Sequence, residues 1–134
     1  MFTEPRVGCG AAIIVDGRIL LLKRKTRPEA GCWGILGGKI DMFETAVETA
    51  RRETEEEAGI RIAACEWLCF VDQIDRSEGT HWVSPVYLVT AFDGTPRLME
   101  PEKHEALGWF ELDALPAPLT TATFRAVEAF ASRR

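Results

Sequence analysis

The stretch from Gly38 to Ile60, GKIDMFETAVETARRETEEEAGI, constrains this chain more than any other part of it. It has the pattern of a turn followed by a helix from about Glu44 to Ala58, and Gly59 stands where glycine commonly ends a helix. Four of the five residues from 53 to 57 are glutamate, and two arginines directly precede them. Any fold for this chain must therefore accommodate a helix with an unusually dense group of carboxylates.

The helical repeat of about 100° per residue separates these carboxylates by face. The expected core-facing stripe consists of Phe43, Ala46, Val47, Ala50, Thr54 and Ala58. Glu57 falls within this stripe, Glu53 on its border and Glu56 beside Glu53. Glu48 and Glu55 fall on the far side, where a solvated charged surface, the usual fate of a glutamate run, explains them.

A carboxylate on a buried helix face needs a compensating partner. Two carboxylates about 4 Å apart repel each other by roughly 4 kcal/mol at an effective dielectric constant of about 20, which is a large part of a typical stability of about 5–15 kcal/mol. Oxygen ligands of this kind suit Mg²⁺ and Mn²⁺. We therefore predict a divalent-metal site at Glu53, Glu56 and Glu57. Because bridging cations allow an acidic pocket to hold a phosphorylated substrate, the site predicts a reaction at phosphorus.

The composition is that of one ordinary globular domain, residues 1–134. The net charge of −5 is concentrated in residues 38–60, which hold seven acidic and three basic residues, so no basic face for a nucleic-acid polymer is expected. No secretory signal or long apolar run is visible, which predicts a cytoplasmic protein without a membrane span. The four cysteines show no CxxC pair and are expected to be reduced, mostly buried thiols.

The pattern outside the helix predicts a mixed sheet. Strands at Val7–Val15 and Arg18–Lys25 are expected to form a hairpin around Asp16-Gly17, a strong two-residue turn signal. Further strands are expected at Ile62–Asp72, His81–Phe92 and Ala106–Phe110, and a second helix at Thr120–Ser132. Pro85 predicts that its strand is an edge strand or is bulged. Antiparallel hairpins on both sides of the first helix indicate an α+β fold rather than a doubly wound parallel sheet.

The stretch from Gly38 to Ile60 also matches a known motif, and the chain resembles the MutT-type Nudix hydrolase family. The family pattern is Gly, five residues, Glu, seven residues, then Arg-Glu-apolar-x-Glu-Glu-x-Gly-apolar, and every fixed polar and glycine position is present. Thr54 replaces an aliphatic residue, and its hydroxyl is expected to bond to the Ala50 carbonyl. Leu36 stands where many members have proline. The resemblance implies a Nudix-type α/β/α sandwich, with a mixed central sheet and flanking helices.

The resemblance implies a role for each carboxylate. Glu53, Glu56 and Glu57 would bind Mg²⁺ or Mn²⁺, together with the carbonyl group of Gly37. Arg52 would orient Glu53 and pair with its charge. Glu53 is also a candidate general base.

Other motif positions would be structural. Glu44 would brace the loop against the helix, and Gly38 and Gly59 would shape its two ends. A glutamate from the loop before the last strand is a second candidate base. Glu105 is preferred for this role over Glu102, because it would lie at the strand entrance.

Substrate contacts are less specific in the sequence. Lys23, Arg24 and Lys39 are candidates for binding a terminal phosphate, although a solvated strand end explains the first two equally well. Candidates for stacking on a base are Trp33, His81, Trp82 and Phe92, for which a core position is the more common role. His104 is a candidate for proton transfer, although the favoured interpretation is that it is an ordinary histidine in a surface loop.

The resemblance is strongest to the small nucleoside-triphosphate enzymes of the family. It implies Mg²⁺-dependent cleavage of a nucleoside triphosphate to the monophosphate and pyrophosphate. The alternatives are cleavage of a nucleoside diphosphate sugar such as ADP-ribose, and a non-catalytic nucleotide-binding module. The expected partner is a small nucleotide, and a homodimer is left open because relatives often form one.

Overall fold

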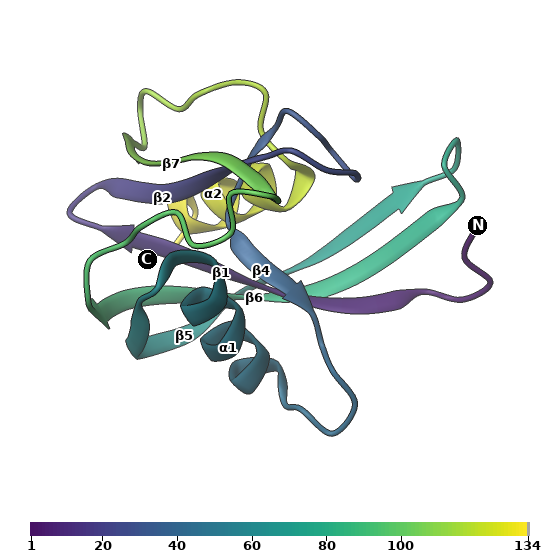
Figure 1. Ribbon diagram of the computed structural model, residues 1–134, viewed down its shortest axis with the longest axis horizontal. Coiled ribbons are helices and arrows are strands. Elements are labelled where there is room, and N and C mark those ends of the chain that lie inside the picture. Colours follow the sequence, from purple (N-terminus) through teal and green to yellow (C-terminus); the bar gives the residue numbers. More distant parts are fainter. Residues whose placement is uncertain (134) are drawn as a thin grey trace.

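A computed structural model describes residues 1–133, which form seven strands and two helices (Figure 1). The strands are β1 (Arg6–Val15), β2 (Arg18–Arg24), β3 (Trp33–Gly34), β4 (Leu36–Lys39), β5 (Arg61–Asp75), β6 (Thr80–Asp93) and β7 (His104–Glu111). The helices are α1 (Ala46–Ala58), between β4 and β5, and α2 (Thr121–Ala131), after β7. The predicted strands and helices are therefore all present, and two short strands, β3 and β4, precede α1. Gly37 and Gly38 lie in β4 and pair with Gly10 and Cys9 of β1, so the turn expected to begin at Gly38 starts only after Lys39.

Strand β1 organises the sheet. It pairs with β6 in parallel and with β2 and β4 in antiparallel orientation, so the sheet is mixed, as predicted. On one side β2 continues the sheet to β3 and β7, and on the other β6 pairs with the outer strand β5. The β1–β2 turn confirms the hairpin prediction, because Asp16 and Gly17 both have positive φ angles, 53° and 76°, as a two-residue hairpin turn requires.

Two apolar cores lie on opposite faces of the sheet, one under each helix. Ala50 and Ala58 of α1 belong to the core that contains Ile13 and Leu20, whereas Ala126 of α2 belongs to the core that contains Ile14 and Leu21. Successive residues of one strand point to opposite faces, so the continuous apolar runs of β1 and β2 fill both cores. This arrangement is the predicted α+β fold with helices covering both faces of the sheet. None of the helices in residues 1–133 has the length and apolar character needed to cross a membrane.

Two detailed expectations differ from the structure. The strand with Pro85 is not at an edge, because β6 lies between β1 and β5; its pairing with β1 instead passes from Val83 to Val86 without a partner for Pro85. Phe43 is 99% exposed and precedes α1, so it does not belong to the core-facing stripe.

The cysteine prediction holds only in part. All four thiols are free, as expected of reduced cysteines. Only Cys9 is buried, however, and Cys32, Cys65 and Cys69 are partly exposed.

Candidate active site

Helix α1 is fixed at both ends by local sequence. Thr45 is its N-cap and forms a capping box with Glu48, in which each side chain accepts a hydrogen bond from the other residue's backbone N–H. Gly59 ends the helix with a left-handed φ of 68°. The helix therefore begins two residues later than predicted, and Glu48, although exposed, is a capping residue rather than only a solvated charge.

Glu57 is the buried carboxylate that the helical repeat predicted, with only 7% of its surface exposed. Its Oε1 accepts a hydrogen bond of 2.8 Å from the backbone N–H of Gly37. Its Oε2 lies 3.7 Å from Nε2 of His104, a side chain that is also buried. The pKa of Glu57 is raised to about 8, mainly by burial and also by the negative charges of Glu53 and Glu100, against the lowering effect of the Gly37 hydrogen bond.

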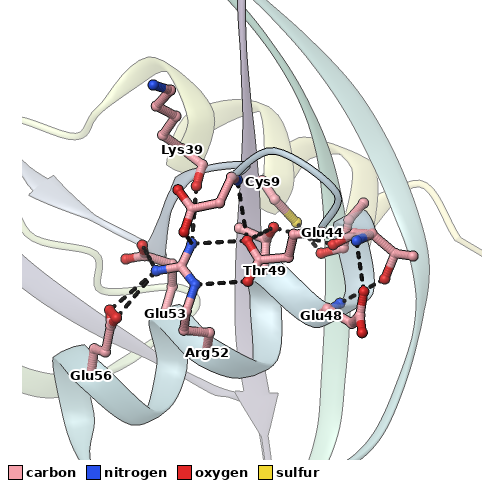
Figure 2. Close-up of polar contacts among 11 residues, drawn as sticks. Cys9, Lys39, Glu44, Glu48, Thr49, Arg52, Glu53 and Glu56 are labelled. Carbon is pink, nitrogen blue, oxygen red and sulfur yellow. Dashed lines mark hydrogen bonds and ion pairs between the residues drawn. The ribbon is translucent and has the colours of Figure 1, made fainter.

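Arg52 is the centre of the polar network on α1 (Figure 2). Its guanidinium group donates to both carboxylate oxygens of Glu44, at 2.8 and 3.0 Å, in the bidentate geometry that suits arginine. Through Nη1 it also donates to Glu53 at 2.7 Å and to Glu56 at 3.2 Å. A further hydrogen bond to the carbonyl of Lys39 joins the helix to the end of β4.

Glu44 links the loop before α1 to the helix. Besides Arg52, its carboxylate accepts hydrogen bonds from the Thr49 hydroxyl at 2.6 Å and from the backbone N–H of Asp41 at 3.2 Å. The hydrogen bonds from Arg52 lower the pKa of Glu44 to about 2, with a smaller contribution from Thr49. Glu44 is therefore ionised at neutral pH and holds the arginine in place.

Glu53 lies directly against Gly38 of β4. A Cβ atom added to Gly38 would overlap the carboxyl group of Glu53, so any larger residue there would displace that carboxylate. Burial raises the pKa of Glu53, and the neighbouring Arg52 partly counteracts that increase. The absence of a side chain at Gly38 therefore leaves room for the carboxylate of Glu53.

The donor set suits a hard divalent cation, but its members are not gathered for one. Glu53 and Glu56 share the guanidinium group of Arg52, while Glu57 faces Gly37 and His104. In the part of the chain that the structure describes, no three Asp, Glu, His or Cys side chains form a ready metal site. Two carboxylates with raised pKa values, Glu53 and Glu57, nevertheless lie where a cation would favour their charged forms.

A pH dependence of stability follows from the burial of Glu57. Its pKa is about 8 in the folded protein against an ordinary value of 4.5, so between these values the folded protein holds a proton that the unfolded chain has released. Rising pH then favours unfolding. We expect the protein in excess EDTA to lose thermal stability from pH 5 to pH 8, and Glu57→Gln to lose less over the same range. An identical loss in the variant, measured by thermal unfolding, would rule out Glu57 as its source.

A cavity of about 210 Å³ opens beside this site. Its wall includes Gly37, Gly38 and Lys39 of β4 and Arg24 at the end of β2. Arg24 donates from Nε to the carbonyl of Pro28 at 2.7 Å, and its charge lowers the pKa of Glu57. The part of β4 that contacts Glu53 and Glu57 therefore also lines a cavity with two basic residues.

The loop before β7 differs from the prediction. Glu105 forms an ion pair with Lys23, at 3.7 Å, so these two predicted site residues contact each other. Glu100 was not singled out in the sequence, yet its charge raises the pKa of Glu57. No spacing signal marks Glu100, because its position depends on how the loop of residues 94–103 passes over the end of α1.

His104 is also placed differently than predicted. It is the first residue of β7 and only 4% exposed, not a surface loop histidine. Burial lowers its pKa, and its Nδ1 atom has no hydrogen-bond partner within residues 1–133. No apolar pattern marks His104 as part of the strand, because the apolar run begins only at Ala106.

Thr54 does not make the hydrogen bond expected of it. Its side chain is fully buried, but Oγ1 lacks a partner within residues 1–133, so the predicted bond to the Ala50 carbonyl is absent. The hydroxyl is therefore simply buried where the motif usually has an aliphatic group.

The candidate stacking residues separate into two groups. Trp33 packs edge-on against Phe110, with ring centroids 4.8 Å apart, and Phe92 stacks on Trp109 at 5.9 Å, so both belong to the cores. Trp82 lines the same cavity as Gly37 and Gly38, whereas His81 lies at the far end of the β5–β6 hairpin, near Met1.

Comparison with known proteins identifies the family to which this chain belongs. The family model for the NUDIX domain matches residues 4–130. The chain belongs to the NUDIX family. A crystal structure of a MutT NUDIX hydrolase from Burkholderia pseudomallei is 60% identical, covers 94% of this chain and 98% of that one, and superposes with a TM-score of 0.93.

Two curated relatives bear on the activity of this NUDIX hydrolase. CTP pyrophosphohydrolase of Escherichia coli is 33% identical over 92% of this chain and 90% of its own length. ADP-ribose pyrophosphatase of Methanocaldococcus jannaschii is 30% identical over 87% of this chain and 68% of its own length. The chain spans less than half the length of two further curated relatives, at 30% and 33% identity. It is thus a hydrolase of the MutT type with pyrophosphohydrolase relatives, and the relatives differ in substrate.

Proposed function

We propose that this NUDIX hydrolase cleaves nucleoside triphosphates to nucleoside monophosphates and pyrophosphate, with Mg²⁺ or Mn²⁺. The observation that carries the proposal is the Gly37-Gly38 segment of β4, which contacts Glu53 and Glu57 and also lines the cavity. A triphosphate in this cavity would bring its phosphates to the carboxylates of α1. Arg24 and Lys39 line the same cavity and supply positive charge for them.

The residues have separate roles in this proposal. Glu53, Glu56, Glu57 and the Gly37 carbonyl would hold the cation, which supplies charge stabilisation at phosphorus and lowers the pKa of bound water. Arg52 fixes the direction of Glu53 and Glu56 through its shared Nη1 group. We assign proton abstraction to Glu53. Among the loop glutamates, Glu100 is better placed than Glu105, which pairs with Lys23.

The match to E. coli CTP pyrophosphohydrolase over 90% of that protein supports the triphosphate substrate.

A nucleoside diphosphate sugar is the second candidate, and one observation favours it. A larger cavity of about 570 Å³ shares Pro28, Glu29, Gln73 and Trp82 with the first and extends along the β5–β6 hairpin. A second sugar has space there. A cytoplasmic location and a homodimer remain predictions.

A substrate panel with product identification tests this function. The four NTPs, the four dNTPs, oxidised purine nucleotides and ADP-ribose are each incubated with the protein and Mg²⁺, and products are separated by anion exchange. We expect the highest kcat/KM for a triphosphate, with equal amounts of monophosphate and pyrophosphate. Release of orthophosphate and diphosphate would contradict the proposed cleavage position, and preference for ADP-ribose would establish the second candidate.

A further inference from the structure

The two cavities meet at a junction formed by Pro28, Glu29, Gln73 and Trp82. These residues come from the β2–β3 loop, β5 and β6, and the first cavity is also lined by Gly37 and Gly38 of β4. If the phosphates lie at Gly37 and Gly38, the remainder of a nucleotide can extend to this junction. A nucleobase would therefore be recognised at this junction.

Glu29 is held rigidly at the junction by groups on two different elements. Its Oε2 accepts hydrogen bonds from the backbone N–H and the hydroxyl of Thr121, at 2.8 and 3.2 Å, at the start of α2. Its Oε1 accepts a hydrogen bond from Nε2 of Gln73 at 3.1 Å. Both carboxylate oxygens are thus engaged, and Glu29 connects α2 to β5.

This contact fixes which way the Gln73 amide points. An ionised carboxylate only accepts hydrogen bonds, so the NH₂ group of Gln73 must be the one that faces Glu29. The carbonyl oxygen and the second N–H of the amide are then directed away from Glu29, and Oε1 accepts no hydrogen bond from residues 1–133. An amide with a fixed orientation presents one acceptor and one donor side by side, the pattern that pairs with a base edge.

Trp82 lies beside this amide. Gln73 and Trp82 are directly paired across β5 and β6, so their side chains project from the same face of the sheet. A planar aromatic group next to a fixed amide provides the two elements of base recognition, stacking and edge hydrogen bonding.

We infer that Gln73 is a specificity-determining residue that binds the hydrogen-bonding edge of the nucleobase, and that Glu29 is its positioning residue. The inference rests on the proposed function, which it extends from the phosphates to the base. It assigns base preference to a contact on β5, outside the Gly38–Ile60 motif.

Binding of nucleoside monophosphates, measured by calorimetry, tests the inference separately from turnover. Gln73→Ala is expected to raise the Kd of the preferred monophosphate by roughly 10- to 100-fold and to narrow the differences in KM among the four NTPs. Its kcat and its affinity for inorganic pyrophosphate should stay close to those of the parent. Asp72→Ala, an exposed neighbour on the same strand, should behave as the parent in every measurement.

Glu29→Gln tests the positioning role. Glutamine cannot accept hydrogen bonds at both of its side-chain atoms, so the amide of Gln73 loses its fixed direction. Discrimination among the bases should therefore fall. Thermal unfolding reports any separate loss of stability at the start of α2. Unchanged monophosphate Kd and base preference in Gln73→Ala would overturn the inference, as would an equal loss of pyrophosphate binding. A parent protein that binds monophosphates but hydrolyses no triphosphate would instead overturn the proposed function alone.

Discussion

Glu57→Gln is expected to lower Mg²⁺-dependent turnover by more than about 100-fold while leaving the protein folded. Changes to groups that only support a metal ligand cost roughly 10- to 100-fold, and Glu57 is proposed as a ligand itself. Glutamine keeps the shape of the side chain and an oxygen that accepts from the Gly37 N–H. It also removes a group whose ionised form is disfavoured by burial, as the raised pKa of Glu57 shows, so the melting temperature should not fall.

Glu55→Gln is the matched control, because Glu55 lies on the same helix but is exposed. Steady-state kinetics and thermal unfolding of both variants make the comparison. Turnover in Glu57→Gln within a few-fold of the parent would remove Glu57 from the site. Unfolding of the variant would mean that the carboxylate is needed for the fold instead.

Arg52→Ala is expected to have the largest effect on stability. It removes the hydrogen bonds to Glu44, Glu53 and Glu56 together and leaves these carboxylates without their shared cation. Because Arg52 is partly exposed, at 29% of its side chain, we expect a loss of about 2 kcal/mol rather than the full cost of breaking a buried pair. Turnover should fall as well, since Glu53 loses its fixed direction.

Arg51→Ala controls for the loss of an arginine at this point of the helix. Arg51 donates one hydrogen bond, to the Ile62 carbonyl, and its removal should cost about 1 kcal/mol with little effect on kcat. Arg52→Lys should recover part of the stability but less of the activity, because lysine cannot bridge several carboxylates with a planar group. Equal melting temperatures for Arg51→Ala and Arg52→Ala would contradict the central role of Arg52.

Much of the fold follows from short-range patterns in the sequence. The Asp16-Gly17 turn, the end of α1 at Gly59 and the buried face that contains Glu57 each depend on residues a few positions apart. Helix α1 begins two residues after the predicted start, because the capping box of Thr45 and Glu48 sets its first turn. Phe43, which the helical repeat places on the core-facing stripe, therefore lies before the helix.

What the sequence did not reveal depends on contacts between distant segments. Glu57 lies apart from Glu53 because Gly37 of β4 and His104 of β7 approach Glu57, whereas Glu53 is held by Arg52 on α1 itself. The helical repeat places carboxylates on a face, but it does not say which partner each one faces. Likewise Glu29, Gln73 and Thr121 come together only because the β2–β3 loop, β5 and α2 converge at one edge of the cavity.

The proposed function requires the buried carboxylate of Glu57 to bind a divalent cation beside the nucleotide cavity. Titration of Mn²⁺ into the protein, followed by electron paramagnetic resonance of the free ion, measures this binding without any turnover. We expect the parent and Glu55→Gln to bind Mn²⁺ with equal affinity, and Glu57→Gln to bind it at least about 10-fold more weakly. Equal Mn²⁺ affinity in the parent and in Glu57→Gln would show that Glu57 is not a ligand.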